Sequence, residues 1–114
     1  MIEATQYPFT VEQGSTFQAQ FRWSVDGQIV NLTGYTAKMQ LRRSYSTPVV
    51  FELSSSNNRI FLGGAAGTIA LDITAADTAL IPAANYLYDL ELTTGTVVRK
   101  LLKGNVVVTS EVTK

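Results

Sequence analysis

Residues 85–114, NYLYDLELTTGTVVRKLLKGNVVVTSEVTK, decide the fold class of this chain. In the first run the residues Tyr86, Tyr88, Leu90 and Leu92 alternate with Leu87, Asp89 and Glu91. A period of two is typical of a half-buried β-strand. Residues 93–95 and 103–105 each contain a glycine, and they divide the stretch into three expected strands. Because such a meander must bury one face against a second layer, the stretch predicts a layered β protein.

The same alternation occurs upstream of this stretch. It is clear in residues 17–23, 35–42 and 68–73, and shorter apolar runs occupy residues 6–11, 29–32, 49–53 and 59–62. Asp26-Gly27 lies after the first of these alternating runs and is a strong signal for a hairpin turn. The sequence therefore predicts short strands along almost the whole chain.

One short helix is expected near residues 74–81. Thr74 is a suitable N-cap, and Asp77 three residues later is the reaching partner in a variant of the capping box. Pro82 ends the helix, because the residue before a proline disfavours the helical conformation. About two helical turns would not be stable alone, so we expect the helix to bridge two strands at one end of the fold.

Together these elements predict an all-β domain. Seven to nine short strands at spacings of about 8 to 12 residues are typical of a sandwich or a barrel. We expect an Ig-like antiparallel β-sandwich that forms a single domain over residues 1–114, with Trp23 facing its core. A closed barrel remains the alternative, because alternation does not distinguish closure from two packed sheets.

Composition limits the classes of function. The chain has 114 residues, nine basic and nine acidic side chains, no His and no Cys, and only 16% of it is charged. A net charge of zero with so few charges favours association, and it is consistent either with an ordinary neutral domain that has polar surface residues or with a protein that remains inside an assembly. The N-terminus does not read as a signal peptide, and no stretch approaches the roughly 20 apolar residues of a membrane span.

Catalytic chemistry has few candidates in this sequence. Without His or Cys the usual general base, the thiolate nucleophile and the imidazole or thiolate metal sites are absent. Asp89 and Glu91 are a carboxylate pair that could serve as acid and base or as a cation site. We favour a solvent-facing role for them, with Arg99 or Lys100 as the cross-strand partner. We therefore expect no enzyme activity, no catalytic residues, no cofactor and no metal.

Phosphate and nucleic-acid binding are also disfavoured. Residues 63–67, GGAAG, lack the spacing of a phosphate-binding loop and predict a tight turn. The basic residues Arg42, Arg43, Arg99, Lys100 and Lys103 occur in a chain of zero net charge. Since a broad basic face is needed to release counterions from phosphates, we expect neither a nucleic-acid partner nor a membrane partner.

Several phrases of the sequence resemble a group of small tailed-phage proteins. They are Gly14-x-Thr16-Phe17, Asp26-Gly27 with residues 30–35 (VNLTGY), residues 39–42 (MQLR), the glycine-rich turn with residues 69–71 (IAL), residues 88–92 (YDLEL), and residues 98–102 (VRKLL) with Gly104, residues 106–108 (VVV) and 111–113 (EVT). In this order they resemble the N-terminal domain of the baseplate upper protein of siphophages and related tail or fibre-attachment proteins.

The resemblance implies a virion structural protein with an Ig-like sandwich that joins other virion components. We expect a non-enzymatic adaptor of the tail, baseplate or fibre attachment, homo-oligomeric within a virion assembled in the host cytoplasm. In that group further receptor-binding parts follow the domain, and this sequence ends after its last expected strand, which favours an adaptor over a receptor-binding protein. A capsid decoration protein is the alternative, and a carbohydrate-binding module is a further alternative.

Docking is the expected mechanism, and strand edges or loops are the expected contacts. An edge at residues 5–11 or 105–112 would add to a neighbour's sheet through backbone hydrogen bonds. The valines at 106–108 would promote aggregation on an open edge, so we expect them to be central or covered. The loops 44–48 and 54–58 are the other candidates. The expected contact residues are Tyr7, Phe9, Val11, Tyr45, Asn57, Asn58, Val106 and Val108.

Overall fold

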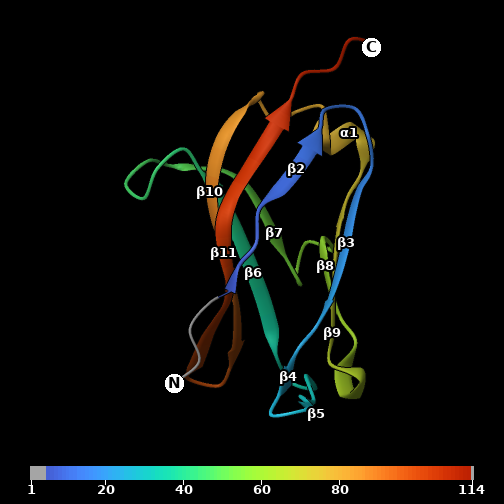
Figure 1. The fold of residues 1–114 in the computed structure, drawn as a ribbon, viewed down its shortest axis with the longest axis vertical. Coiled ribbons are helices and arrows are strands. Elements are labelled where there is room, and N and C mark those ends of the chain that lie inside the picture. The colour runs from blue at the N-terminus through green and yellow to red at the C-terminus, as the bar shows by residue number, and fades with distance from the viewer. Residues whose placement is uncertain (1–4, 114) are drawn as a thin grey trace.

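The computed structural model describes residues 5–113, which form two facing β-sheets (Figure 1). The larger sheet has six strands in the order β1-β11-β10-β6-β7, and β2 pairs with β11 next to β1. The smaller sheet has the order β3-β9-β8. The strands of the larger sheet are β1 (Thr5–Gln6), β2 (Phe9–Glu12), β6 (Thr36–Arg42), β7 (Val49–Ser54), β10 (Ala84–Thr94) and β11 (Val97–Thr109). Those of the smaller sheet are β3 (Phe17–Arg22), β8 (Ile60–Leu62) and β9 (Thr68–Ile73).

The remaining elements are short connections between these strands. The hairpin of β4 (Ser24–Val25) and β5 (Gln28–Ile29) follows β3, and the 3-10 helix η1 (Gly64–Ala66) connects β8 to β9. The helix α1 (Ala75–Thr78) connects β9 to β10. The hairpin turn has Asp26 and Gly27 both at positive φ, 51° and 80°, as a tight two-residue turn requires.

The chain crosses between the sheets in the manner of an immunoglobulin fold. It passes from β2 to β3, returns to β6 and β7, crosses again to β8 and β9, and ends in β10 and β11. At the start of β10, the Tyr86 hydroxyl donates to the Pro82 carbonyl at 2.5 Å. This contact is the tyrosine corner found in Ig-like sandwiches. The predicted all-β, Ig-like sandwich is confirmed, except that β1 and β2 run parallel to β11.

The core lies between the two sheets and is built by alternate residues of each strand. The inward residues of β9 and β10 are the ones that alternation predicts, and they are 0–5% exposed: Ile69, Leu71, Ile73, Tyr86, Tyr88, Leu90 and Leu92. The other strands of the larger sheet complete the buried hydrophobic set with Phe9, Val11, Ala37, Met39, Leu41, Leu53, Val106 and Val108. The inward residues of β3 are only half-buried.

Three expectations about the elements are corrected, and one is confirmed. Eleven strands replace the expected seven to nine in residues 5–113, because the first run is broken at Tyr7-Pro8 and the hairpin adds two strands of two residues. The tight turn predicted at residues 63–67 is confirmed, and it contains one turn of 3-10 helix with Gly67 in the left-handed conformation. The helix ends at Thr78 instead of residue 81. Thr74 caps it as expected, but the Asp77 carboxylate pairs with Arg59.

The expected break at residues 103–105 is wrong. β11 continues through it, so residues 84–109 form one long hairpin with a single turn at Gly95. Gly104 has a different role. Its φ is +154°, and a Cβ there would lie 3.0 Å from the Tyr7 carbonyl oxygen. The glycine therefore allows the first segment of the chain to pass close against β11.

Candidate docking surfaces

The outer face of the larger sheet carries a hollow of about 530 Å³. Outward side chains of β6, β10 and β11 form its floor, and the loop between β6 and β7 forms part of its rim. The lining is mostly polar. It consists of Gln6, Lys38, Gln40, Arg42, Ser44, Tyr45, Leu87, Tyr88, Asp89, Glu91, Lys100, Lys103, Gly104 and Asn105.

Lys100 forms ion pairs with both carboxylates in this hollow. Its Nζ lies 2.6 Å from Glu91 Oε2 and 3.3 Å from Asp89 Oδ2. Partial burial lowers the pKa of Lys100, but the hydrogen bond to Glu91 and the charges of both carboxylates outweigh it, so the pKa is raised above its usual value. Asp89 and Glu91 are thus the solvent-facing carboxylates that the sequence favours, and Lys100 is their cross-strand partner.

Tyr45 projects from the rim of the hollow and is 88% exposed. The loop that carries it is held by its neighbours. Arg42 Nη1 donates to the Thr47 carbonyl at 2.7 Å, and the backbone N–H of Ser44 donates to Thr47 Oγ1 at 2.9 Å. An ordered loop that leaves a large aromatic side chain in solvent is suited to a contact, as expected for Tyr45.

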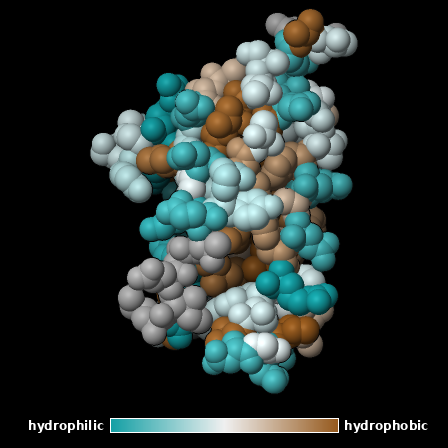
Figure 2. Space-filling model, in the orientation of Figure 1, coloured by the Kyte–Doolittle hydropathy of each residue, from teal (hydrophilic) through white to brown (hydrophobic). Residues whose placement is uncertain are grey.

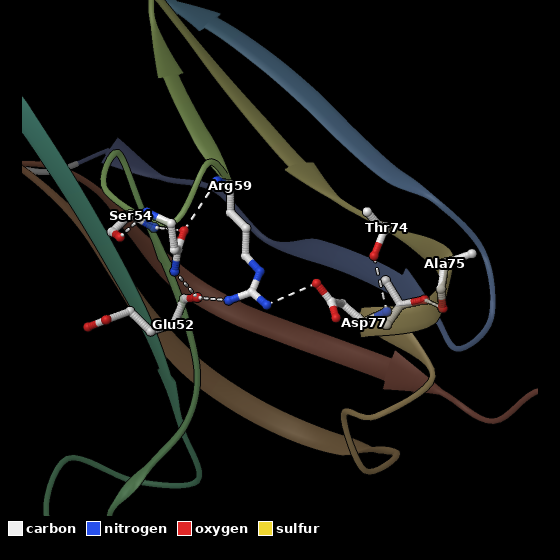
Figure 3. A network of polar contacts seen from close by, with 8 residues as sticks. Glu52, Ser54, Arg59, Thr74, Ala75 and Asp77 are labelled. Atoms are coloured by element: carbon white, nitrogen blue, oxygen red, sulfur yellow. Dashed lines mark hydrogen bonds and ion pairs between the residues drawn. The ribbon is translucent and has the colours of Figure 1, made fainter.

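The loop with Asn57 and Asn58 serves the fold itself (Figure 3). Asn57 Oδ1 accepts from the backbone N–H of Ser54 at 2.9 Å, and its Nδ2 donates to the Glu52 carbonyl at 3.0 Å. Asn58 occupies the turn at a φ of 63°. Both polar atoms of the Asn57 side chain therefore bond to the backbone of β7, which makes Asn57 a poor candidate for a contact with a partner.

Four of the expected contact residues are core residues. Phe9, Val11, Val106 and Val108 are 1–6% exposed and lie between the sheets. β11 pairs with β10 on one side and with β1 and β2 on the other. The expectation that residues 105–112 form a free edge is therefore wrong, and the alternative that the three valines are central in the sheet is right.

Tyr7 lies at the opening between the two sheets. It is 44% exposed, and its ring packs edge-on against Phe21 and tilted against Phe9, with ring centroids 5.1 Å apart in both pairs. Its carbonyl oxygen accepts the hydroxyl of Tyr88 at 2.5 Å. Burial and then the nearby Tyr7 raise the pKa of Tyr88 above its usual value. The Tyr7 ring thus has one face in the core and only part of its surface in solvent.

Beside Tyr7 a second hollow of about 530 Å³ enters the space between the sheets. No local sequence pattern indicates this hollow, because its walls come from strands far apart in the chain. It is more apolar than the first hollow. Its lining is Tyr7, Phe21, Arg22, Trp23, Ser24, Val25, Asp26, Ile69, Leu90, Leu101 and Leu102.

Within residues 5–113 no group of three or more His, Cys, Asp or Glu side chains is close enough to hold a metal ion. None of the helices in that range is long and apolar enough to cross a membrane.

The fold and these surfaces define an Ig-like β-sandwich with a polar hollow on one sheet and an apolar opening between the sheets. No protein-family model matches the chain, and no curated protein sequence is significantly similar to it. Among solved structures, one similar fold is the extracellular domain of the voltage-gated sodium channel beta4 subunit. It has 10% sequence identity and a TM-score of 0.48, and the match covers 98% of each chain. That protein forms parallel homodimers with a role in cell–cell adhesion.

Proposed function

We propose that this chain is a non-enzymatic structural protein of a bacteriophage virion. It acts as an adaptor in the tail, baseplate or fibre attachment, and it docks to other virion proteins. The observation that carries the docking role is the polar hollow with Tyr45 at its rim. Small-molecule sites are concave and mostly apolar, whereas this hollow is lined mostly by polar groups, among them four basic residues (Lys38, Arg42, Lys100 and Lys103) and two acidic ones (Asp89 and Glu91). A broad polar surface with one exposed aromatic anchor suits contact with a protein.

The phage assignment is supported by where the resembling phrases lie. Residues 39–42 are in β6, residues 88–92 in β10, and residues 98–102 and 106–108 in β11. These three strands are neighbours in the larger sheet. These four phrases therefore lie together in the larger sheet and include the floor of the polar hollow, whereas those at residues 14–17 and 69–71 belong to the start of β3 and to β9 of the smaller sheet.

The absence of turnover is part of the proposal. The chain has no His and no Cys, so a nucleophile would need Lys or a carboxylate as its base. The carboxylate pair in the hollow, Asp89 and Glu91, is already bound to Lys100. Because the Lys100 ammonium bridges the two carboxylates, a role as a solvated ion-pair network is favoured for them over a role as a catalytic acid and base.

Imaging of virions tests the location of the protein. In the phage that encodes the chain, deletion of its gene should give particles that lack part of the tail tip or the fibres, while the heads keep their surface. Particles with altered heads and complete tails would refute the tail assignment and favour the alternative, a capsid decoration protein.

Substitutions in the hollow test the docking surface. Tyr45→Ala combined with Gln40→Arg should lower incorporation of the protein into particles by about tenfold, because the aromatic anchor is lost and a further positive charge is added to a hollow that already has more basic than acidic residues. Val112→Ser is the matched control, since Val112 is 97% exposed and lies outside the hollow. Equal incorporation of both proteins would refute docking through this face. Glycan binding that Tyr45→Ala abolishes would favour the carbohydrate-binding alternative.

A further inference from the structure

The two sheets end in edges that differ in how well they are protected against strand addition. An edge strand presents unpaired N–H and C=O groups, and natural proteins block it with prolines, charges, short strands or covering loops. The edge at β1 and β2 is interrupted by Pro8, which has no N–H to offer. The edge at β8 is only three residues long.

The edge at β7 is covered by its own loop (Figure 3). The Glu52 carbonyl accepts from Asn57 Nδ2 and from Arg59 Nη1, both at 3.0 Å. The backbone N–H of Ser54 donates to Asn57, and its carbonyl accepts from the backbone N–H of Arg59. The second half of this edge is thus already occupied by side chains and backbone of the same chain.

β3 has none of these protections. Among residues 5–113 this strand of six residues pairs with β9 alone, and its register is regular from Phe17↔Ile73 to Arg22↔Thr68. It contains no Pro, no Gly and one charged residue, Arg22. It is therefore a long edge with a regular register and a single charged residue.

The register shows which backbone groups point away from β9. The Trp23 N–H donates to the Gly67 carbonyl, so the odd-numbered residues of β3 bond to β9. Because alternate residues of a strand direct their N–H and C=O groups to the same side, those of Gln18, Gln20 and Arg22 point to the open side. Three donors and three acceptors are thus aligned along this edge.

The inward side of β3 is also incompletely covered. Phe17, Ala19 and Phe21 are half-buried, whereas their partners on β9 are only 1–2% exposed. The apolar hollow between the sheets reaches Phe21 and Trp23. Figure 2 shows hydrophobic residues gathered down the middle of the face on which β11, β2 and β3 lie in Figure 1. An added strand would satisfy the backbone groups and would also cover this apolar surface.

We propose that this strand is β3 of a second copy of the chain, paired antiparallel about a two-fold axis at Gln20. In this register Gln20 faces Gln20 of the second copy, and Gln18 faces Arg22. The three N–H and three C=O groups of each copy are then all bonded, in six hydrogen bonds, and the two smaller sheets become one continuous sheet. The C2 dimer is a closed assembly, so strand addition ends there.

The side chains of FQAQFRW fit this self-pairing. On the outer face the one charged residue, Arg22, meets the neutral Gln18 instead of another Arg22. On the inner face the small Ala19 lies opposite the large Phe21, and Phe17 lies opposite Trp23. Aromatic residues opposite one another are a favourable cross-strand pair. Ala19 leaves room for the ring of Phe21 opposite it. A partner of different sequence would have no reason to match this pattern, which favours a second copy.

Cysteine cross-linking tests the register, because the native chain has no Cys. Gln20→Cys should form a disulfide-linked dimer under mild oxidation, because directly opposite residues have Cα atoms about 5.5 Å apart. Gln18→Cys is the matched control on the same strand and face. In the proposed register residue 18 faces residue 22 of the second copy, so the two cysteines at position 18 are separated by four residues along the strand, roughly 13 Å, and should not cross-link.

Sedimentation of the purified chain tests the dimer itself. We expect a concentration-dependent dimer in the micromolar range. Gln20→Lys should weaken it at least tenfold, because two like charges face each other at the axis. An equimolar mixture of Gln20→Lys and Gln20→Glu should restore it. Thr10→Lys on β2 should leave it unchanged.

Three results would overturn the proposal. One is a monomer at every concentration, as expected if another segment of the chain covers β3. Another is equal cross-linking of the two cysteine variants, and the third is a dimer lost through Thr10→Lys but not Gln20→Lys. The proposal extends the docking role but does not depend on the virion assignment. The purified chain tests the dimer, and particle imaging tests the location.

Discussion

Replacement of Arg59 by Met should destabilise the fold more than any other loss of a single charge. Arg59 connects the edge of the larger sheet to the helix between β9 and β10 (Figure 3). Its Nη2 lies 2.9 Å from Asp77 Oδ2, and its Nη1 donates to the Glu52 carbonyl at 3.0 Å. Its guanidinium also lies 4.4 Å from the centre of the Phe51 ring. Met keeps the length of the side chain and removes all three interactions.

The expected loss of unfolding free energy follows from these three contacts. The ion pair is about two-thirds buried and contributes about 1 kcal/mol. A charged donor on a backbone carbonyl adds about 1 kcal/mol, and the contact with the aromatic ring adds about 0.5 kcal/mol. Some packing of the Met side chain offsets part of the sum, so we expect a loss of about 2 kcal/mol. For a domain of this size that lowers the Tm by about 8 °C.

Urea unfolding monitored by the fluorescence of Trp23, the only tryptophan, measures this loss. Arg99→Met is the matched control, because Arg99 is an exposed arginine on β11, and it should cost less than about 0.5 kcal/mol. Asp77→Asn keeps the backbone N–H that Thr74 caps, so a double-mutant cycle with Arg59→Met isolates the ion pair at about 1 kcal/mol. Equal losses for Arg59→Met and Arg99→Met would refute the reasoning.

Two further substitutions test other contacts. Gly104→Ala should cost about 2 kcal/mol, more than Gly95→Ala, because both glycines have positive φ but only at Gly104 would a Cβ press on the backbone of Tyr7; equal losses in urea unfolding would contradict this. Tyr88→Phe should cost about 1 kcal/mol at pH 7. Because burial raises the pKa of folded Tyr88 above the unfolded value of about 10, its contribution is complete below pH 10 and falls as the pH rises, so the difference in stability between the two proteins should shrink toward pH 11. A constant difference would contradict the assignment.

Most of the fold could be predicted because its signals are local. The alternation in residues 17–23 and 68–73 and in the first run of residues 85–114 identified the inward residues of β3, β9 and β10. Asp26-Gly27 and Thr74 identified a hairpin and a cap in the same way. The break predicted at Gly104 was wrong because a glycine in a sequence can indicate either a turn or a close approach of another backbone segment. The segment that approaches, Tyr7, is almost a hundred residues away in the sequence.

Prediction of the docking surfaces requires the order of the strands, which no local sequence pattern contains. Tyr45 was found because an aromatic residue in a polar loop is visible in the sequence. Phe9, Val11, Val106 and Val108 were placed in contacts because an edge was assumed at each terminus. Which strand is an edge depends on strand order, and β11 gains neighbours on both sides only through the parallel pairing of β1 and β2.

Because the chain has few charges, its association depends on how well each sheet edge is protected against strand addition. With 16% charged residues and a net charge of zero, little repulsion keeps two copies apart, so protection against strand addition must be local. Pro8, the loop at Asn57 and the shortness of β8 supply it at three edges by three different means. β3 has none of these three devices, and one Lys at Gln20 would protect it while leaving the inward side chains untouched. The sequence FQAQFR of β3 therefore favours an edge that is available for pairing. Its self-complementary register favours β3 of a second copy as the strand that pairs with it.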